Sequence, residues 1–185
     1  VCEPEPAYVG PDLGGEVCIP GHAAIFDADV DALEARLDHY NDDLPALGGE
    51  TPLATALSEG KAIGYEGFEL GNKFPREPGA LRAVLAQHGL ACVSGWYSGR
   101  LARGTVADEI AAVGSHLDLL SANGAQVMVY GEVADSIQGR PEPLSRRPRL
   151  ATDAEWSAYG ERLTAFARHL LGRGVRLAYH HHMGA

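Results

Sequence analysis

The sequence predicts an α/β fold, a (β/α)8 TIM barrel of which this chain carries about the first half. Three observations predict it. A helix, a glycine-bearing turn and a short apolar strand follow one another four times after residue 50, as is typical of a parallel sheet with helical crossovers. No glycine-rich dinucleotide fingerprint stands between a strand and the next helix. Polar and aromatic residues gather just after the strands, where barrel enzymes place their sites.

The first unit is TPLATALSEGKAIGYEGFELGNK, residues 51–73. Thr51 is expected to cap a helix, and a proline next to it suits the first helical turn. Leu53 and Leu57 recur at helical spacing, and Gly64 is placed to end the helix. The stretch GFELG that follows is typical of a strand.

The other three units repeat this order over residues 77–99, 105–132 and 152–182. Each helix is expected to stop at the glycine before its strand, namely Gly89, Gly124 and Gly174. The expected strands are LACVSGW, AQVMVYG and VRLAY. An open, doubly wound sheet would also fit the alternation, but a barrel explains why polar residues follow the strands. A whole barrel typically has about 250 residues, so four units predict a truncated one.

Two segments stand outside this rhythm. Residues 1–40 are rich in proline, glycine and acidic residues and are expected to be mostly loop, with a helix over 27–40. We therefore divide the chain into an atypical N-terminal segment, 1–40, and a partial barrel, 41–185. The stretch GRPEPLSRRPRLATD, residues 139–153, holds three prolines and four arginines. It is either a solvated connection or a lid whose cationic groups close over an oxygen-rich substrate.

Composition excludes several classes of partner. The chain has 25 acidic and 15 basic residues, a formal net charge of −10, which disfavours nucleic acid and anionic membranes. No apolar run reaches the roughly 18–20 residues of a membrane span. The cysteines, Cys2, Cys18 and Cys92, lack the spacing of a zinc site or a disulfide framework. A reducing, cytoplasmic location is therefore expected, with Cys92 as a small buried hydrophobic residue.

The motifs at the strand ends together resemble one family. NDDLPALGGETPL, GFELGNKFPRE, GLACVSGWYSGRL, VMVYGEV, PLSRRPRL and RLAYHHHMG occur in this order over residues 41–185. They resemble the myo-inosose-2 dehydratases of bacterial inositol catabolism, within the superfamily of sugar isomerase and epimerase-like barrels. The resemblance implies removal of water from scyllo-inosose (2-keto-myo-inositol) to give a trihydroxycyclohexanedione. It further implies a divalent metal, manganese or cobalt, and glutathione as an additional requirement.

This chemistry assigns roles to the strand-end residues. Dehydration beside a ketone needs a base, a group that holds the enolate oxygen and an acid for the departing hydroxide. Because side chains alternate along a strand, His180 and His182 are expected to face the barrel mouth and His181 the helices or the rim. In related barrels the position of His180 carries a metal ligand and that of His182 the base. The expected catalytic residues are His182, Lys73 and Glu132, and the expected metal ligand is His180.

The remaining candidates would bind substrate. Trp96 and Tyr97 are expected to form one apolar wall that stacks on a cyclohexane polyol. Asn72 would hydrogen-bond vicinal hydroxyls or only shape its turn. Glu69 would act as an acid or base, bind polyol, or form a buried ion pair. The expected substrate-binding residues are Glu69, Asn72, Trp96, Tyr97 and His181.

Other hypotheses remain open. The same proton abstraction serves a ketose epimerase or isomerase, and the three histidines would equally suit a structural cluster. A truncated barrel could also be an inactive fragment. An open half-barrel exposes sheet edges, so we expect poor solubility or a homo-oligomer unless a partner completes it.

Overall fold

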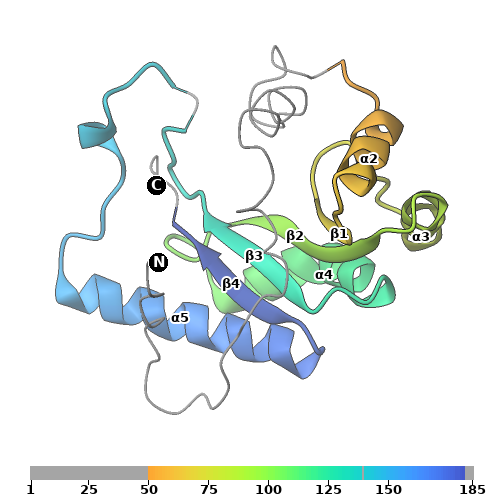
Figure 1. Cartoon of the computed structure of the whole chain (residues 1–185). Coiled ribbons are helices and arrows are strands. Elements are labelled where there is room, and N and C mark those ends of the chain that lie inside the picture. The colour runs from red at the N-terminus through yellow and green to blue at the C-terminus, as the bar shows by residue number, and fades with distance from the viewer. Residues whose placement is uncertain (1–49, 139, 182–185) are drawn as a thin grey trace, which may run out of the picture.

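The computed structural model describes residues 50–138 and 140–181, so the expected helix over 27–40 and the whole of segment 1–40 lie outside the described residues. The elements are α2 (Leu53–Ala62), β1 (Gly67–Leu70), α3 (Pro78–Gln87), β2 (Ala91–Gly99), α4 (Val106–Ala122), β3 (Val127–Glu132), the short 3-10 helix η2 (Leu144–Arg146), α5 (Asp153–Gly172) and β4 (Arg176–His180). The strands form one sheet in the order β1-β2-β3-β4, and every neighbouring pair is parallel. The predicted parallel α/β architecture is confirmed (Figure 1).

The helix ends lie where the glycines predict them. Each of the four predicted stop glycines has a positive φ, from 62° to 102°, a left-handed conformation that only glycine adopts without strain: Gly64, Gly89, Gly124 and Gly174. The predicted cap at Thr51 is wrong. Pro52 occupies the N-cap position of α2, and no side chain caps that helix. Effective side-chain caps begin the later helices instead, including a capping box of Thr152 and Glu155 on α5.

The two faces of the sheet differ in what covers them. Tyr97 on β2 stacks on His116 of α4, with ring centroids 6.0 Å apart, and lies 6.1 Å from the Phe166 ring of α5. We call this side the helix face; Figure 1 shows α4 and α5 alongside β2, β3 and β4. The opposite side, which carries Trp96, we call the Trp96 face.

The core lies between the helix face and the helices. Tyr130 of β3 and Phe166 of α5 are its largest fully buried side chains, and their rings meet edge to face at 5.9 Å. Burial of one such large apolar side chain contributes about 1.5–3 kcal/mol. Cys92 belongs to this core at 5% exposure, which confirms its prediction as a buried hydrophobic residue.

A β-bulge interrupts the pairing of β1 with β2. Phe68 pairs with Cys92, but the next residue, Glu69, pairs with Ser94. Val93 is therefore the extra residue on β2. In a regular ladder without the bulge, Glu69 would lie opposite Val93. The bulge thus aligns a carboxylate with a hydroxyl, and it positions part of the candidate site.

Candidate functional site

The Trp96 face carries a cluster of polar and aromatic side chains from β1, β2 and β4, together with a glycine of β3. Alternation along β2 puts Ser94, Trp96 and Ser98 on this side, away from the helices. Its members are Glu69, Ser94, Trp96, Ser98, Gly131 and His180. We call them the Trp96 cluster. Three of the predicted site residues, Glu69, Trp96 and His180, thus lie on one face.

Trp96 is at the centre of this cluster. Its indole N–H donates to the Ser98 hydroxyl at 2.8 Å, which fixes the ring plane. The His180 ring meets the indole edge to face, with centroids 5.1 Å apart. A Cβ at Gly131 would lie 2.3 Å from the indole, so the absence of a side chain there leaves room for the ring. Tryptophan and histidine from strands 84 residues apart in sequence therefore form one surface.

The second part of the cluster is the pair of Glu69 and Ser94. The Ser94 hydroxyl donates to the Glu69 carboxylate at 2.6 Å across the bulge. Ser94 is buried, whereas the Glu69 side chain is exposed. The serine orients the carboxylate, and a carboxylate has lone pairs for more than one donor. A hydroxyl-rich ligand is the kind of molecule that such an acceptor suits.

Tyr97 lies on the opposite face from Trp96, so the predicted joint wall of Trp96 and Tyr97 is wrong. The Tyr97 hydroxyl donates at 2.7 Å to Glu109 in the first turn of α4. Burial, and then the Glu109 carboxylate, raise the pKa of Tyr97 far above its usual value. Adjacent residues of a strand point to opposite sides, and that alternation is the reason.

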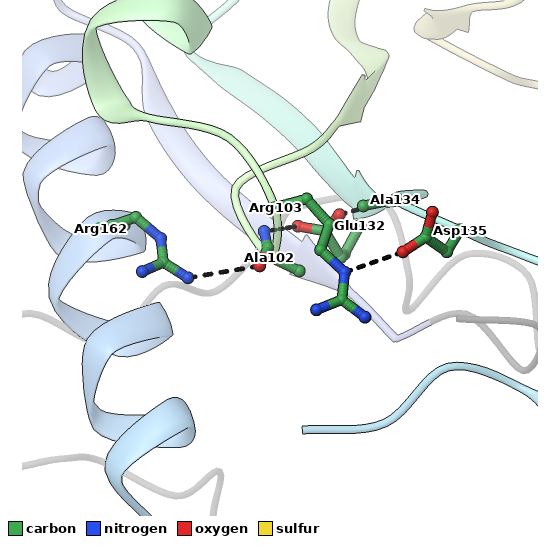
Figure 2. Close-up of polar contacts among 6 residues, drawn as sticks. All are labelled: Ala102, Arg103, Glu132, Ala134, Asp135 and Arg162. Carbon is green, nitrogen blue, oxygen red and sulfur yellow. Dashed lines mark hydrogen bonds and ion pairs between the residues drawn. The ribbon is translucent and has the colours of Figure 1, made fainter. Parts of the chain in front are cut away.

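Glu132 also lies on the helix face, where it holds a loop. One carboxylate oxygen accepts from the backbone N–H of Ala102 at 2.9 Å and from the Tyr130 hydroxyl at 2.9 Å. The other accepts from Ala134 N–H at 2.9 Å, and Arg162 of α5 donates to carbonyls of the same loop (Figure 2). A proton-transfer role for Glu132 at the Trp96 cluster does not fit this position.

Three further predicted residues, Asn72, Lys73 and His181, follow the carboxyl ends of their strands. Asn72 and Lys73 follow β1 in a turn, and the partly buried Lys73 ammonium donates to the Thr51 carbonyl at 2.6 Å. His181 directly follows β4 and lines a cavity together with Glu132. His182 lies outside the described residues.

Sequence reasoning missed Ser94, Ser98 and Gly131. The two serines had a signal, because they stand two residues on either side of Trp96 and alternation puts them on its face. Gly131 had none, since its importance depends on the cross-strand position of the indole.

Comparison with known proteins gives this geometry a context. No family model matches the chain. The rhizopine catabolism protein MocC of Rhizobium meliloti is 49% identical over 148 residues, 78% of this chain and 44% of that protein. An inosose dehydratase of Geobacillus thermodenitrificans is 37% identical over 151 residues, 81% of this chain and 51% of that protein. The chain is homologous to proteins that are named inosose dehydratase and rhizopine catabolism protein MocC. It spans about half the length of the curated relatives it matches.

A solved structure supports the fold of this chain. The sugar phosphate isomerase/epimerase of Parabacteroides distasonis superposes on 76% of the chain with a TM-score of 0.53, at 13% sequence identity. The match covers 49% of that protein, so the described sheet corresponds to part of its barrel. At this identity the likeness concerns the fold alone.

The donor set for the implied metal is not assembled within the described residues. Among residues 50–138 and 140–181, no three His, Cys, Asp or Glu side chains come together around one ion position. His180, the expected metal ligand, has its ring against the Trp96 indole. In the same part of the chain, no helix has both the length and the apolar character needed to cross a bilayer.

Proposed function

We propose that this chain belongs to a dehydratase that removes water from scyllo-inosose and yields a trihydroxycyclohexanedione in inositol catabolism. The observation that carries the proposal is the 37% identity to an inosose dehydratase over 81% of the chain. The Trp96 cluster supports it, because an aromatic ring beside a carboxylate and two hydroxyls suits a cyclic polyol.

In this proposal the polyol ring lies against the Trp96 indole. Its axial C–H bonds meet the apolar ring face, and its hydroxyl groups reach polar atoms at the edge. The Glu69 carboxylate, held by Ser94, accepts from one or two of these hydroxyls. His180, edge-on to the indole, contacts the ketone end of the substrate. Substrate orientation of this kind contributes much of the rate enhancement.

The reaction itself needs proton transfers. We assign the base that removes the proton alpha to the ketone to His182, because a neutral imidazole is available near neutral pH. The electron pair of that C–H bond forms the enolate. When the enolate expels the beta hydroxyl, that oxygen takes a proton from the His182 imidazolium or the Lys73 ammonium and leaves as water. Lys73 is assigned to the enolate oxygen or the departing hydroxide, because it follows β1 in a turn at the end of the strand. Glu132 acts only by holding the loop that contains Ala102.

Cofactors form a separate part of the proposal. A divalent ion, Mn²⁺ or Co²⁺, would polarise the ketone, with His180 as one ligand. The described residues do not supply the rest of a ligand set, so no step above depends on the ion. Glutathione is proposed only from the family resemblance.

The test is an assay with scyllo-inosose and added Mn²⁺ or Co²⁺, with the dione followed by its ultraviolet absorbance. His182→Ala should lower the rate at least 100-fold, the usual contribution of a general base. The matched control is His88→Ala, a histidine at the end of α3 that hydrogen-bonds Ser58. Formation of an epimer of the substrate, with no dione, would favour the epimerase or isomerase alternative. Equal rates in His182→Ala and His88→Ala would refute the assignment of His182.

A second candidate function has one observation in its favour. The 49% identity to the rhizopine catabolism protein MocC is higher than the identity to the inosose dehydratase. The dehydration would then serve rhizopine catabolism. Comparing growth of a deletion strain on myo-inositol and on rhizopine distinguishes the two, since only one substrate should fail to support growth.

A further inference from the structure

Part of the segment 139–153, predicted as either a solvated connection or a lid, lines a cavity through residues 147–150. The cavity has a volume of about 390 Å³ and opens at the carboxyl edge of the sheet, between the β2–α4 loop, the start of α5 and the end of β4. Its walls include Arg147 to Leu150 of the segment, together with Arg103, Trp156 and His181. The size is that of a pocket for a small organic molecule.

This cavity is separate from the Trp96 cluster. Tyr179 lines it and stacks on Tyr130 at 6.1 Å, which puts both rings on the helix face. His180, the next residue, meets Trp96 on the other face. The neighbouring residues Tyr179 and His180 thus point to opposite faces of the sheet, one to the cavity and the other to the Trp96 cluster.

Positive charge dominates the cavity wall. Three arginines, Arg103, Arg147 and Arg149, line the cavity from two separate segments, and Glu132 is the one acidic residue among its lining residues. Arg147 also donates to the Leu144 carbonyl at 3.2 Å. Both Glu132 oxygens already accept hydrogen bonds, from the Ala102 and Ala134 N–H groups and from the Tyr130 hydroxyl. Arg103 donates its Nε to Asp135 at 2.8 Å, and a guanidinium has further N–H donors. In a chain with a net charge of −10, three arginines around one cavity are a local excess of positive charge.

Aromatic rings form the apolar part of the cavity. Trp156 and Tyr159 of α5 meet edge to face at 6.4 Å, and Tyr179 completes this part of the wall. Trp156 is 57% exposed and Tyr179 is 47% exposed, unusually high values for aromatic side chains of this size. Aromatic faces beside guanidinium groups suit a ring that carries an anionic group.

We propose that this cavity is a second ligand site, for an organic anion in which a carboxylate or phosphate is attached to a ring or other apolar group. The arginines hold the anionic oxygens, bidentately where geometry allows, and the aromatic rings cover the apolar part. The scyllo-inosose of the proposed reaction is uncharged, so this ligand is a different molecule. The cavity would therefore bind this anion while the Trp96 cluster binds scyllo-inosose, and the bound anion would regulate the proposed reaction.

Tryptophan fluorescence tests this directly, because the chain has two tryptophans, Trp96 and Trp156. In a Trp96→Phe protein, Trp156 alone reports on the cavity. The probes are phenyl phosphate and benzoate, with phenol as the neutral control. We expect saturable quenching by at least one anion, and the stronger of the two identifies phosphate or carboxylate as the preferred group.

Two arginine variants in the same background complete the test. Arg149→Ala removes a cavity arginine, whereas Arg146→Ala removes an exposed arginine of η2 that does not line the cavity. We expect Kd to rise at least tenfold in the first and less than twofold in the second, with equal melting temperatures. No quenching, equal quenching by phenol, or equal Kd values in the two variants would each overturn the proposal.

Discussion

The Glu132 carboxylate at the end of β3 accepts a 2.9 Å hydrogen bond from the backbone N–H of Ala102, which lies thirty residues earlier in the chain. The same carboxylate binds Ala134 N–H and the Tyr130 hydroxyl, so it joins the end of β3 to the loop after β2. Tyr130 in turn accepts from Leu101 N–H at 3.1 Å. A buried acid thereby determines the position of a loop that lines the cavity.

Glu132→Ala should therefore destabilise the fold. It leaves the partly buried Ala102 N–H and the buried Ala134 N–H without their acceptor, at a cost of about 2–3 kcal/mol in the free energy of unfolding. Urea denaturation followed by circular dichroism measures this. The control is Glu161→Ala, an exposed position of α5, with an expected change within about 0.5 kcal/mol. Equal destabilisation by the two variants would contradict the role of Glu132.

Gly131→Ala should displace the Trp96 ring. The new Cβ would lie 2.3 Å from the indole, so the ring must move, at a cost of about 1–3 kcal/mol. In a Trp156→Phe background the emission maximum of Trp96 should shift. Gly160→Ala in α5 is the matched control: its Cβ meets nothing within 4 Å, and we expect it to stabilise the protein by about 0.5–1 kcal/mol. An unchanged Trp96 emission in the first variant would show that the indole lies elsewhere.

His116 should make stability depend on pH. Burial, chiefly, lowers its pKa below the usual value, and its buried Nε2 has no hydrogen-bond partner among the described residues. The unfolded state therefore binds a proton more readily, and stability should fall as pH drops below about 6.5. Melting temperatures at pH 7.5 and 5.5 measure this. His116→Phe, which cannot titrate, should show a smaller drop; an equal drop would assign the effect to other groups.

Cys92 should be unreactive in the folded protein. Burial raises the pKa of its thiol to about 11, so little thiolate exists at neutral pH. In a background of Cys2→Ser and Cys18→Ser, a thiol-reactive dye should label the native chain at least 100-fold more slowly than the urea-unfolded chain. Fast labelling of the native chain would contradict the buried position of Cys92 in the core.

The fold could largely be predicted from local signals. Helix periodicity and the four stop glycines depend on neighbouring residues, and they locate every helix–strand unit of the described chain. The bulge at Val93 could not be predicted, because it depends on how β1 and β2 align. The Thr51 cap failed for a similar reason: cap residue types permit a cap but do not fix where the helix begins.

The candidate site was predictable only in part. Glu69 was identified as an acidic residue within an apolar strand, and Trp96 and His180 from their residue types at strand ends. The structure brings all three to one face. Applying alternation to Trp96 and Tyr97 would have separated them and drawn attention to Ser94 and Ser98. The role of Glu132 could not be read from its own strand, because its partners lie on a different loop.

The most direct test of the central claim is a titration of the Trp156→Phe protein with scyllo-inosose, in which Trp96 is the sole tryptophan. If the Trp96 face holds the cyclic ketone, emission should be quenched to saturation, and Glu69→Gln should raise Kd about tenfold. Quenching that is absent here but present in the Trp96→Phe protein would place the substrate in the arginine-lined cavity and contradict the claim.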